Sequence, residues 1–193
     1  MNQILAPYEP IIGESGNVNI NRSNFWGAFD QGTWERLSSN QRVDALQQLE
    51  NWSARRLGRE PVPLSPDPQL EGTSTNGEYH PGSKSISINP SLIERNDPFQ
   101  AMATTLHEGR HAYQHQVSNG LETYKNFDPV DGMTADQNRG IWRANMRADG
   151  YYSKEKGHTF FQYRYQPIEA DANNYSDRIM QELWQRYGNN EHY

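Results

Sequence analysis

The segment from Asp97 to Gly120 constrains the fold most, because it carries signals for both ends of a helix and a periodic apolar stripe between them. Asp97-Pro98 is typical of a helix start, since proline fits the first helical turn, and Asn119-Gly120 is typical of a stop. The apolar residues that recur at helical spacing are Phe99, Met102, Leu106, Tyr113 and Val117. The pattern predicts a helix over about residues 97–117 with one buried face.

This predicted helix carries the sequence His-Glu-Gly-Arg-His at residues 107–111. Residues four apart lie on the same face of a helix, so His107 and His111 can converge on one Zn²⁺ ion. Glu108 follows the first histidine and can take a proton from a metal-bound water. With 100° per residue, both histidines fall at the border of the apolar stripe, where the floor of a cleft is expected. We therefore predict that His107 and His111 bind zinc and that Glu108 is a general base.

A catalytic zinc site usually needs a third protein ligand. His115 is unsuitable because eight residues of straight helix span about 12 Å, so it is expected to make no metal contact. Glu169 and Asp171 lie in the first turn of a second predicted helix, over residues 167–187, at the borders of its apolar face. Glu169 is the predicted third ligand. Asp171 is a candidate to accept a hydrogen bond from a ligand histidine, which would fix the orientation of the ring.

The rest of the chain predicts a third helix and a short strand. Alternating polar and apolar residues over 84–89 favour a strand with one buried face. A capping serine or asparagine, spaced apolar residues and Gly58 favour a helix over residues 39–58. The other segments are expected to be irregular or ambiguous: an arm over 1–24, a proline-rich loop over 59–77, a loop over 120–140 and an aromatic-rich stretch over 141–165.

Composition excludes several classes of protein. The chain of 193 residues has no cysteine, which excludes disulfides, thiolate-bound zinc and a thiol nucleophile. Its net charge of −6 offers no basic field for nucleic acid. No stretch approaches the ~20 apolar residues of a membrane span, and the first residues do not resemble a signal peptide. We expect a cytoplasmic protein or one exported by a dedicated secretion system.

We expect two regions that unfold as one cooperative unit. Residues 1–76 are predicted to form an arm and a helix that pack on a core formed by residues 77–193. The N-terminal region has too few apolar residues for a core of its own. Its tryptophans, Trp26, Trp34 and Trp52, are therefore expected to pack on the rest of the chain.

The motifs together resemble those of zincin metallopeptidases, in particular the branch with a glutamate ligand, the gluzincins. The resemblance rests on residues 106–114, on the strand around 85–88 and on residues 166–172. The chain also resembles small zincin domains of bacteria and phages, including toxin and effector modules, which implies a cognate immunity or inhibitor protein as a partner. Gluzincins often have an aspartate four residues after the ligand glutamate, and this chain has Asn173 there.

The resemblance implies an α+β, zincin-like fold that is mainly helical, with a small twisted sheet packed on the helix of the motif. It implies that His107, His111 and Glu169 bind zinc and that Glu108 is the general base. The strand at 84–89 would be the one nearest the cleft, and an extended peptide could add to its edge.

The expected activity is hydrolysis of peptide bonds in a protein or peptide substrate. The oxyanion formed in this reaction needs a donor besides zinc. Residues shortly before Glu169 can supply it, and among Tyr163, Tyr165, His158 and Arg164 we select Tyr165. Tyr151 is expected to line the core or the cleft wall.

Three alternatives differ in substrate or in chemistry. A peptidoglycan amidase or endopeptidase would use the same metal on a different substrate. A zincin-fold binding module would have lost hydrolysis, although the intact Glu108 argues against this. A zinc protease associated with nucleic acid is disfavoured by the acidic balance of the chain.

Overall fold

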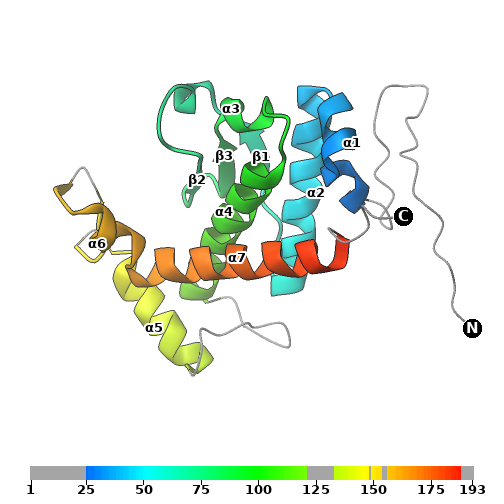
Figure 1. The fold of residues 1–193 in the computed structure, drawn as a ribbon. Helices are drawn as coiled ribbons and strands as arrows, with labels where there is room; N and C mark the ends of the chain where they lie inside the picture. The colour runs from blue at the N-terminus through cyan, green and yellow to red at the C-terminus, as the bar shows by residue number, and fades with distance from the viewer. Residues whose placement is uncertain (1–24, 121–132, 148, 154–155, 188–193) are drawn as a thin grey trace, which may run out of the picture.

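A computed structural model describes residues 25–120, 133–147, 149–153 and 156–187 of the chain. The described part is a mixed α+β structure in which helices α2 and α4 pack against one three-stranded sheet (Figure 1), as expected for the class of fold. The irregular arm predicted for residues 1–24 lies outside the described residues.

The described elements follow one another along the chain from Phe25 to Tyr187. In order they are η1 (Phe25–Phe29), α1 (Gln31–Arg36), α2 (Ser39–Leu57), β1 (Leu64–Pro66), η2 (Pro68–Leu70), β2 (Gly77–His80), β3 (Ser85–Ile88), α3 (Pro90–Ile93), α4 (Phe99–Ser118), α5 (Ala135–Asn145), α6 (Phe160–Arg164) and α7 (Pro167–Tyr187).

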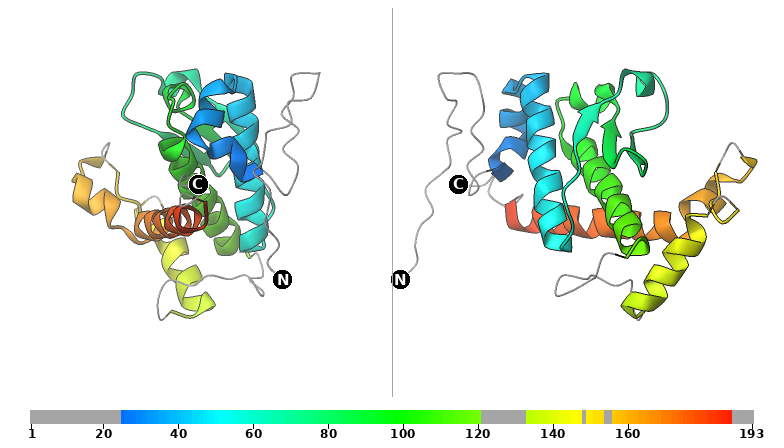
Figure 2. Two further views of the ribbon diagram at one scale, coloured as in Figure 1. Left: turned by 45° about the vertical axis from the view of Figure 1, so that its right-hand side comes forward. Right: turned by 180° about the vertical axis from the view of Figure 1, so that it is seen from behind.

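Helix α4 is the central element and confirms the helix predicted over 97–117. Pro98 is its N-cap residue, and the Asp97 carboxylate accepts a hydrogen bond of 2.9 Å from the backbone N–H of Phe99. The helix packs against α2, the sheet, α5 and α7. Figures 1 and 2 show α2 and the sheet beside α4, with α7 crossing its C-terminal half. The helix that carries the His-Glu-Gly-Arg-His motif is thus fixed from several sides.

The other two predicted helices are also confirmed. Helix α7 spans Pro167–Tyr187, as expected. The N-cap of helix α2 is Ser38, one residue before the first predicted cap, because Ser38 and Gln41 form a capping box. It ends at Gly58, whose φ of 66° is the left-handed conformation that glycine adopts without strain.

The sheet has the strand order β1-β3-β2, with β1 parallel and β2 antiparallel to β3. Strand β3 confirms the strand predicted at 84–89, but it is the central strand, so both its edges are already paired. The expectation that it lies nearest the cleft and offers an edge to a peptide is therefore wrong. Strand β2 packs on α4, as β3 does, but it is an edge strand and leaves one edge open in the described part of the molecule.

Two segments predicted as loops contain regular structure. Strand β1 lies within the proline-rich residues 59–77, where an edge position tolerates the missing N–H of Pro66. Helix α5 begins within residues 120–140 because Thr134 and Gln137 form a capping box. Tertiary pairing in the first case and capping in the second outweigh the local loop signals.

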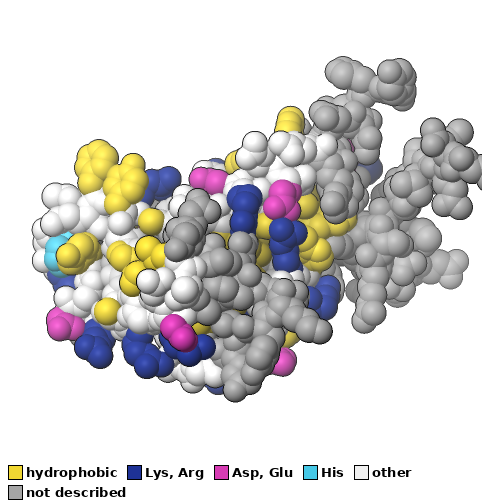
Figure 3. Space-filling view, turned by 90° about the horizontal axis from the view of Figure 1, so that it is seen from below, with side chains coloured by type: hydrophobic (Ala, Val, Ile, Leu, Met, Phe, Trp, Pro, Cys, Tyr) yellow, Lys and Arg dark blue, Asp and Glu magenta, His cyan; other side chains and the backbone are white. Residues whose placement is uncertain are grey.

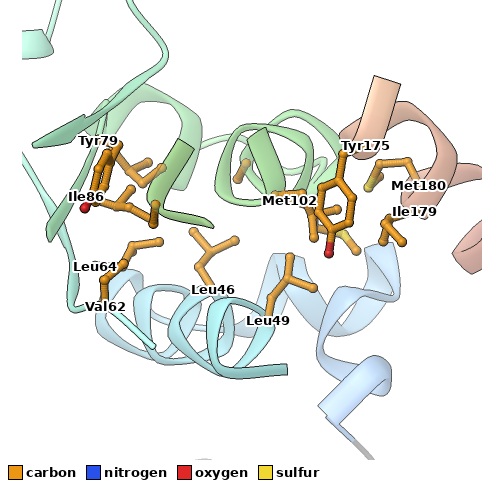
Figure 4. Close-up of a cluster of buried hydrophobic side chains, with 14 of the residues drawn as sticks. Leu46, Leu49, Val62, Leu64, Tyr79, Ile86, Met102, Tyr175, Ile179 and Met180 are labelled. Carbon is orange, nitrogen blue, oxygen red and sulfur yellow. The ribbon is translucent and has the colours of Figure 1, made fainter. Parts of the chain in front are cut away.

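The hydrophobic core lies between α2, α4, α7 and the sheet. Figure 4 shows Leu46 and Leu49 of α2 pointing toward Met102 of α4 and Tyr175 of α7, with Ile86 on the sheet side. The same core continues through residues before and after the boundary predicted at residue 76. Trp34 is fully buried, while Trp26 and Trp52 are partly buried against the core. The division into residues 1–76 and 77–193 stays a prediction.

A buried ion pair supports α4 from the side of α2. The Arg59 guanidinium donates two hydrogen bonds of 2.6 Å to the Glu50 carboxylate, and both side chains are fully buried. The backbone N–H of Val62 donates a further bond of 3.0 Å to Glu50. A Cβ atom at Gly109 would lie only 2.7 Å from Glu50 Oε2 and 2.9 Å from Arg59 Nη2. The glycine inside the motif therefore permits the close approach of α4 to this pair.

No helix within the described residues has both the length and the apolar character that a membrane span requires.

Candidate metal centre

The structure brings together the three predicted metal ligands, two from α4 and one from the first turn of α7. His107 Nε2 lies 3.3 Å from Glu169 Oε2, and His111 Nε2 lies 3.5 Å from Glu169 Oε1. The two histidine Nε2 atoms are 3.1 Å apart. Glu169 is almost fully buried, with 3% of its side chain exposed, while the histidine rings remain partly exposed. The cluster is therefore a polar site with its open side at the imidazole rings.

The donor set and its spacing fit a zinc ion. Zinc is bound by imidazole nitrogen and carboxylate oxygen at about 2.0–2.2 Å, so two ligands at a tetrahedral angle lie roughly 3.3–3.5 Å apart. The two Nε2 atoms are 3.1 Å apart, and each lies 3.3 or 3.5 Å from one oxygen of the Glu169 carboxylate, which is close to these values. Among the described residues, His107, His111 and Glu169 form a group that could hold a metal ion.

Without a metal, the cluster is held together by the attraction between protonated His111 and the Glu169 carboxylate. Burial alone would lower the pKa of His111, but hydrogen bonding and proximity to the Glu169 carboxylate raise it to about 9. Burial alone would raise the pKa of Glu169, but hydrogen bonds from His107 and His111 hold it well below its usual range. At neutral pH the carboxylate is therefore ionised and His111 carries a proton that a metal ion must displace.

Glu108 lies beside this cluster and is held by the edge of the sheet. Its side chain is buried, and Oε2 accepts a hydrogen bond of 2.9 Å from the backbone N–H of Tyr79 in β2. The Tyr79 hydroxyl in turn contacts Nδ1 of His115 at 3.0 Å. His115, expected to make no metal contact, lies outside the three-residue group and joins α4 to β2 instead.

Asp171 contacts Arg110 and Gln114 instead of a ligand histidine, so the prediction that it orients a histidine ring directly is wrong. Its carboxylate accepts hydrogen bonds from Arg110 and Gln114, and it is Gln114 that contacts His111, with 2.8 Å between Oε1 and Nδ1. Gln114 lies three residues after His111 on the same face of α4, and its Oε1 therefore reaches Nδ1 of the ring, while Asp171 contacts the other end of the Gln114 amide. Asn173 donates to the backbone carbonyl of Glu169 within its own helix.

Two tyrosines lie at the cluster, and neither is the predicted Tyr165. The Tyr151 hydroxyl donates a hydrogen bond of 3.1 Å to Glu169 Oε1. The Tyr163 ring packs edge-on against Tyr151, with 6.2 Å between ring centroids. Burial, followed by the nearby Glu169 charge, raises the pKa of both hydroxyls, so both keep their protons at neutral pH.

Tyr165 points elsewhere, which corrects its assignment as the oxyanion donor. Its side chain is 68% exposed and stacks on Phe161. Figure 3 shows hydrophobic side chains on the surface at the end of the molecule where α6 lies; the exposed aromatic residues of this end include Phe160, Phe161 and Tyr165. Tyr163 and Tyr165 are two residues apart, about 200° around a helical turn, so only one of them can face Glu169.

Comparisons of the chain with protein-family profiles, with curated proteins and with solved structures gave no match. The geometry of the site is therefore the basis on which a function is proposed.

Proposed function

We propose that this protein is a zinc-dependent peptidase with a zincin-like arrangement of its site. The observation that carries the proposal is the convergence of the His107 and His111 Nε2 atoms, 3.1 Å apart, on the Glu169 carboxylate, whose oxygens lie 3.3 and 3.5 Å from them, with Glu108 fixed next to this cluster. The placement of the motif helix against an edge strand, with the third ligand on a crossing helix, supports the zincin-like assignment.

His107, His111 and Glu169 would hold the metal. When bound, zinc polarises a carbonyl oxygen and lowers the pKa of a coordinated water. Glu108 then takes the proton of the attacking water and passes it to the leaving amine. The Tyr79 N–H binds one oxygen of this carboxylate, which fixes its position relative to the ligands.

The two tyrosines supply different functions in this scheme. Tyr151 donates to Glu169 and so orients the ligand carboxylate. Tyr163 packs edge-on against Tyr151, which donates to Glu169, and burial followed by the Glu169 charge raises the pKa of the Tyr163 hydroxyl, so that it stays protonated. A protonated hydroxyl next to the site can donate a hydrogen bond to the oxyanion that develops during amide hydrolysis. We assign this role to Tyr163.

The edge of β2 favours a polypeptide substrate. Ile86 pairs with Tyr79 in the ladder, but its own N–H donates to Pro63 on the other side of β3. The N–H of Tyr79 faces the outer edge of β2, where it binds Glu108. An extended peptide that adds to this edge would therefore pass the general base, with backbone hydrogen bonds and little selection by side chains.

The test is the Glu108→Gln variant, which keeps the size of the side chain and removes its basicity. We expect zinc content and folding close to those of the wild type, and a loss of ~10²–10⁴-fold in hydrolysis of casein. Glu71→Gln, at an exposed glutamate away from the cluster, is the matched control and should keep full activity. Full activity of Glu108→Gln would contradict the mechanism.

The substrate is tested with the same wild-type protein. Digestion of purified cell walls but not of casein would replace the peptidase with a peptidoglycan hydrolase that uses the same site. Zinc binding without turnover of either substrate would contradict the enzyme and favour a binding module.

A further inference from the structure

The structure assigns to Gln114 the role of a positioning residue for His111, an inference that deepens the proposed metal site and rests on it. Gln114 is fully buried on α4, one turn beyond His111. All three polar contacts of its amide are to groups that cannot rearrange freely: a backbone carbonyl, a paired carboxylate and a ligand imidazole.

The chemistry of these contacts fixes which way the amide points. Its Nε2 donates to the backbone carbonyl of Ile168 at 2.9 Å and to Asp171 Oδ2 at 2.7 Å. An amide NH₂ has two hydrogens, and both are used here. The reversed amide would place its oxygen against two acceptors, so Oε1 must be the atom that faces His111.

This orientation determines the tautomer of His111. Gln114 Oε1 lies 2.8 Å from His111 Nδ1 and can only accept a hydrogen bond, so Nδ1 must carry the hydrogen. In the neutral ring, the lone pair is then on Nε2, the atom that faces His107 and Glu169. A metal ligand needs this arrangement, in which one ring nitrogen is held by a neighbouring acceptor and the other is available.

Gln114 is itself held by a buried ion pair that joins the two helices of the site. Arg110 donates to Asp171 through Nε at 2.8 Å and through Nη2 at 3.0 Å. Arg110 directly precedes His111 on α4, and Asp171 lies two residues after Glu169 on α7. The guanidinium also lies over three aromatic rings, those of Tyr113, Trp142 and Tyr175, at 4.7, 5.5 and 4.9 Å from their centroids. The Arg110–Asp171 pair therefore fixes the amide of Gln114. It also holds α4 and α7 in the arrangement that brings the metal ligands together.

The first experiment needs no variant. In the zinc-loaded wild type, nitrogen-15 NMR of the histidine rings should show His111 with hydrogen on Nδ1 and zinc on Nε2. In the metal-free protein, the hydrogen on Nδ1 of His111 should exchange slowly with water because Gln114 holds it. Zinc on Nδ1, or a rapidly exchanging Nδ1 hydrogen in the metal-free protein, would overturn the assignment.

The second experiment replaces Gln114 with methionine, which has a similar length and neither amide atom. Loss of a group that orients a metal ligand typically weakens metal binding 10–100-fold, and we expect a weakening of ~10–100-fold for zinc at a temperature where the variant is folded. Gln116→Met is the matched control, since Gln116 lies on the same helix and donates only at the surface, to the Glu60 carbonyl. It should bind zinc like the wild type.

The two readouts separate this inference from the proposed function. A folded Gln114→Met protein with the zinc affinity of the wild type would overturn the role of Gln114 while leaving the metal site intact. A wild type that binds no zinc would overturn the metal site. The slow Nδ1 hydrogen of metal-free His111, and its loss in Gln114→Met, would still decide whether Gln114 positions the ring.

Discussion

Substitution of Gly109 by alanine tests the packing of the motif helix on the buried Glu50–Arg59 pair. The added Cβ would lie 2.7 Å from Glu50 Oε2 and 2.9 Å from Arg59 Nη2, whereas ordinary contacts are 3.4–4 Å. The two side chains would have to retreat by at least about half an ångström. Both are fully buried and are held by bonds of 2.6 Å to each other and of 3.0 Å to the backbone, so they have little room to do so.

Two opposing effects decide whether Gly109→Ala raises or lowers the free energy of unfolding. Alanine in place of glycine within a helix gains about 1 kcal/mol. Overpacking of a rigid site costs about 1–3 kcal/mol, and breaking a buried ion pair costs about 3–5 kcal/mol. Because the pair is locked on both sides, we place the clash at the upper part of the overpacking range. Gly109→Ala should therefore lower the free energy of unfolding by about 1–2 kcal/mol.

The control is Gly140→Ala on α5, where an added Cβ meets nothing within 4 Å. This variant should gain about 0.5–1 kcal/mol from helix propensity alone. Both free energies are measured by equilibrium urea unfolding with a chelator present, so that metal binding does not contribute. If Gly109→Ala is stabilised as much as Gly140→Ala, the close packing of α4 on the ion pair is not the constraint that we describe.

Three further predictions concern the site and the cooperativity of the fold. Tyr163→Phe should lower kcat on a peptide substrate by about 10²–10³-fold, as for loss of an oxyanion donor, while Tyr165→Phe should keep full activity; equal effects would refute the assignment. Zinc must displace the proton of His111, so the apparent affinity for zinc should rise by up to about tenfold per pH unit from pH 7 and level off above about pH 9. The affinity is measured by competition with a chelator of known affinity, and a flat pH profile would contradict the raised pKa of His111. Metal-free protein should unfold in a single calorimetric transition, because one core continues through residue 76; two transitions would indicate separate domains.

The sequence predicts the long helices well because their signals are local. Pro98, Gly58 and Pro167 mark helix ends by their own backbone restrictions, and the spacing of His107 and His111 needs only a helix to bring them together. The third ligand is predictable for a related reason: Glu169 follows a helix start closely, at the border of an apolar face. These features depend on few long-range contacts.

Helix α5 was missed although its signal is local, whereas the other features that sequence reasoning missed depend on tertiary contacts. The signal for α5 was present in the Thr134–Gln137 spacing, which is that of a capping box, although the surrounding residues suggested a loop. Nothing local distinguishes Tyr163 from Tyr165, because the choice depends on the rotation of α6 against α7. Likewise, the contact of Gln114 with His111 depends on Asp171, 57 residues further along the chain.

The central claim is that His107, His111 and Glu169 together bind one zinc ion. The most direct measurement is a crystal structure of the protein with one equivalent of zinc, with data collected on both sides of the zinc absorption edge. We predict a single anomalous peak at about 2.0–2.2 Å from His107 Nε2, His111 Nε2 and a Glu169 carboxylate oxygen. A zinc ion bound at His115 or elsewhere, with the three predicted ligands still in contact with one another, would contradict the account.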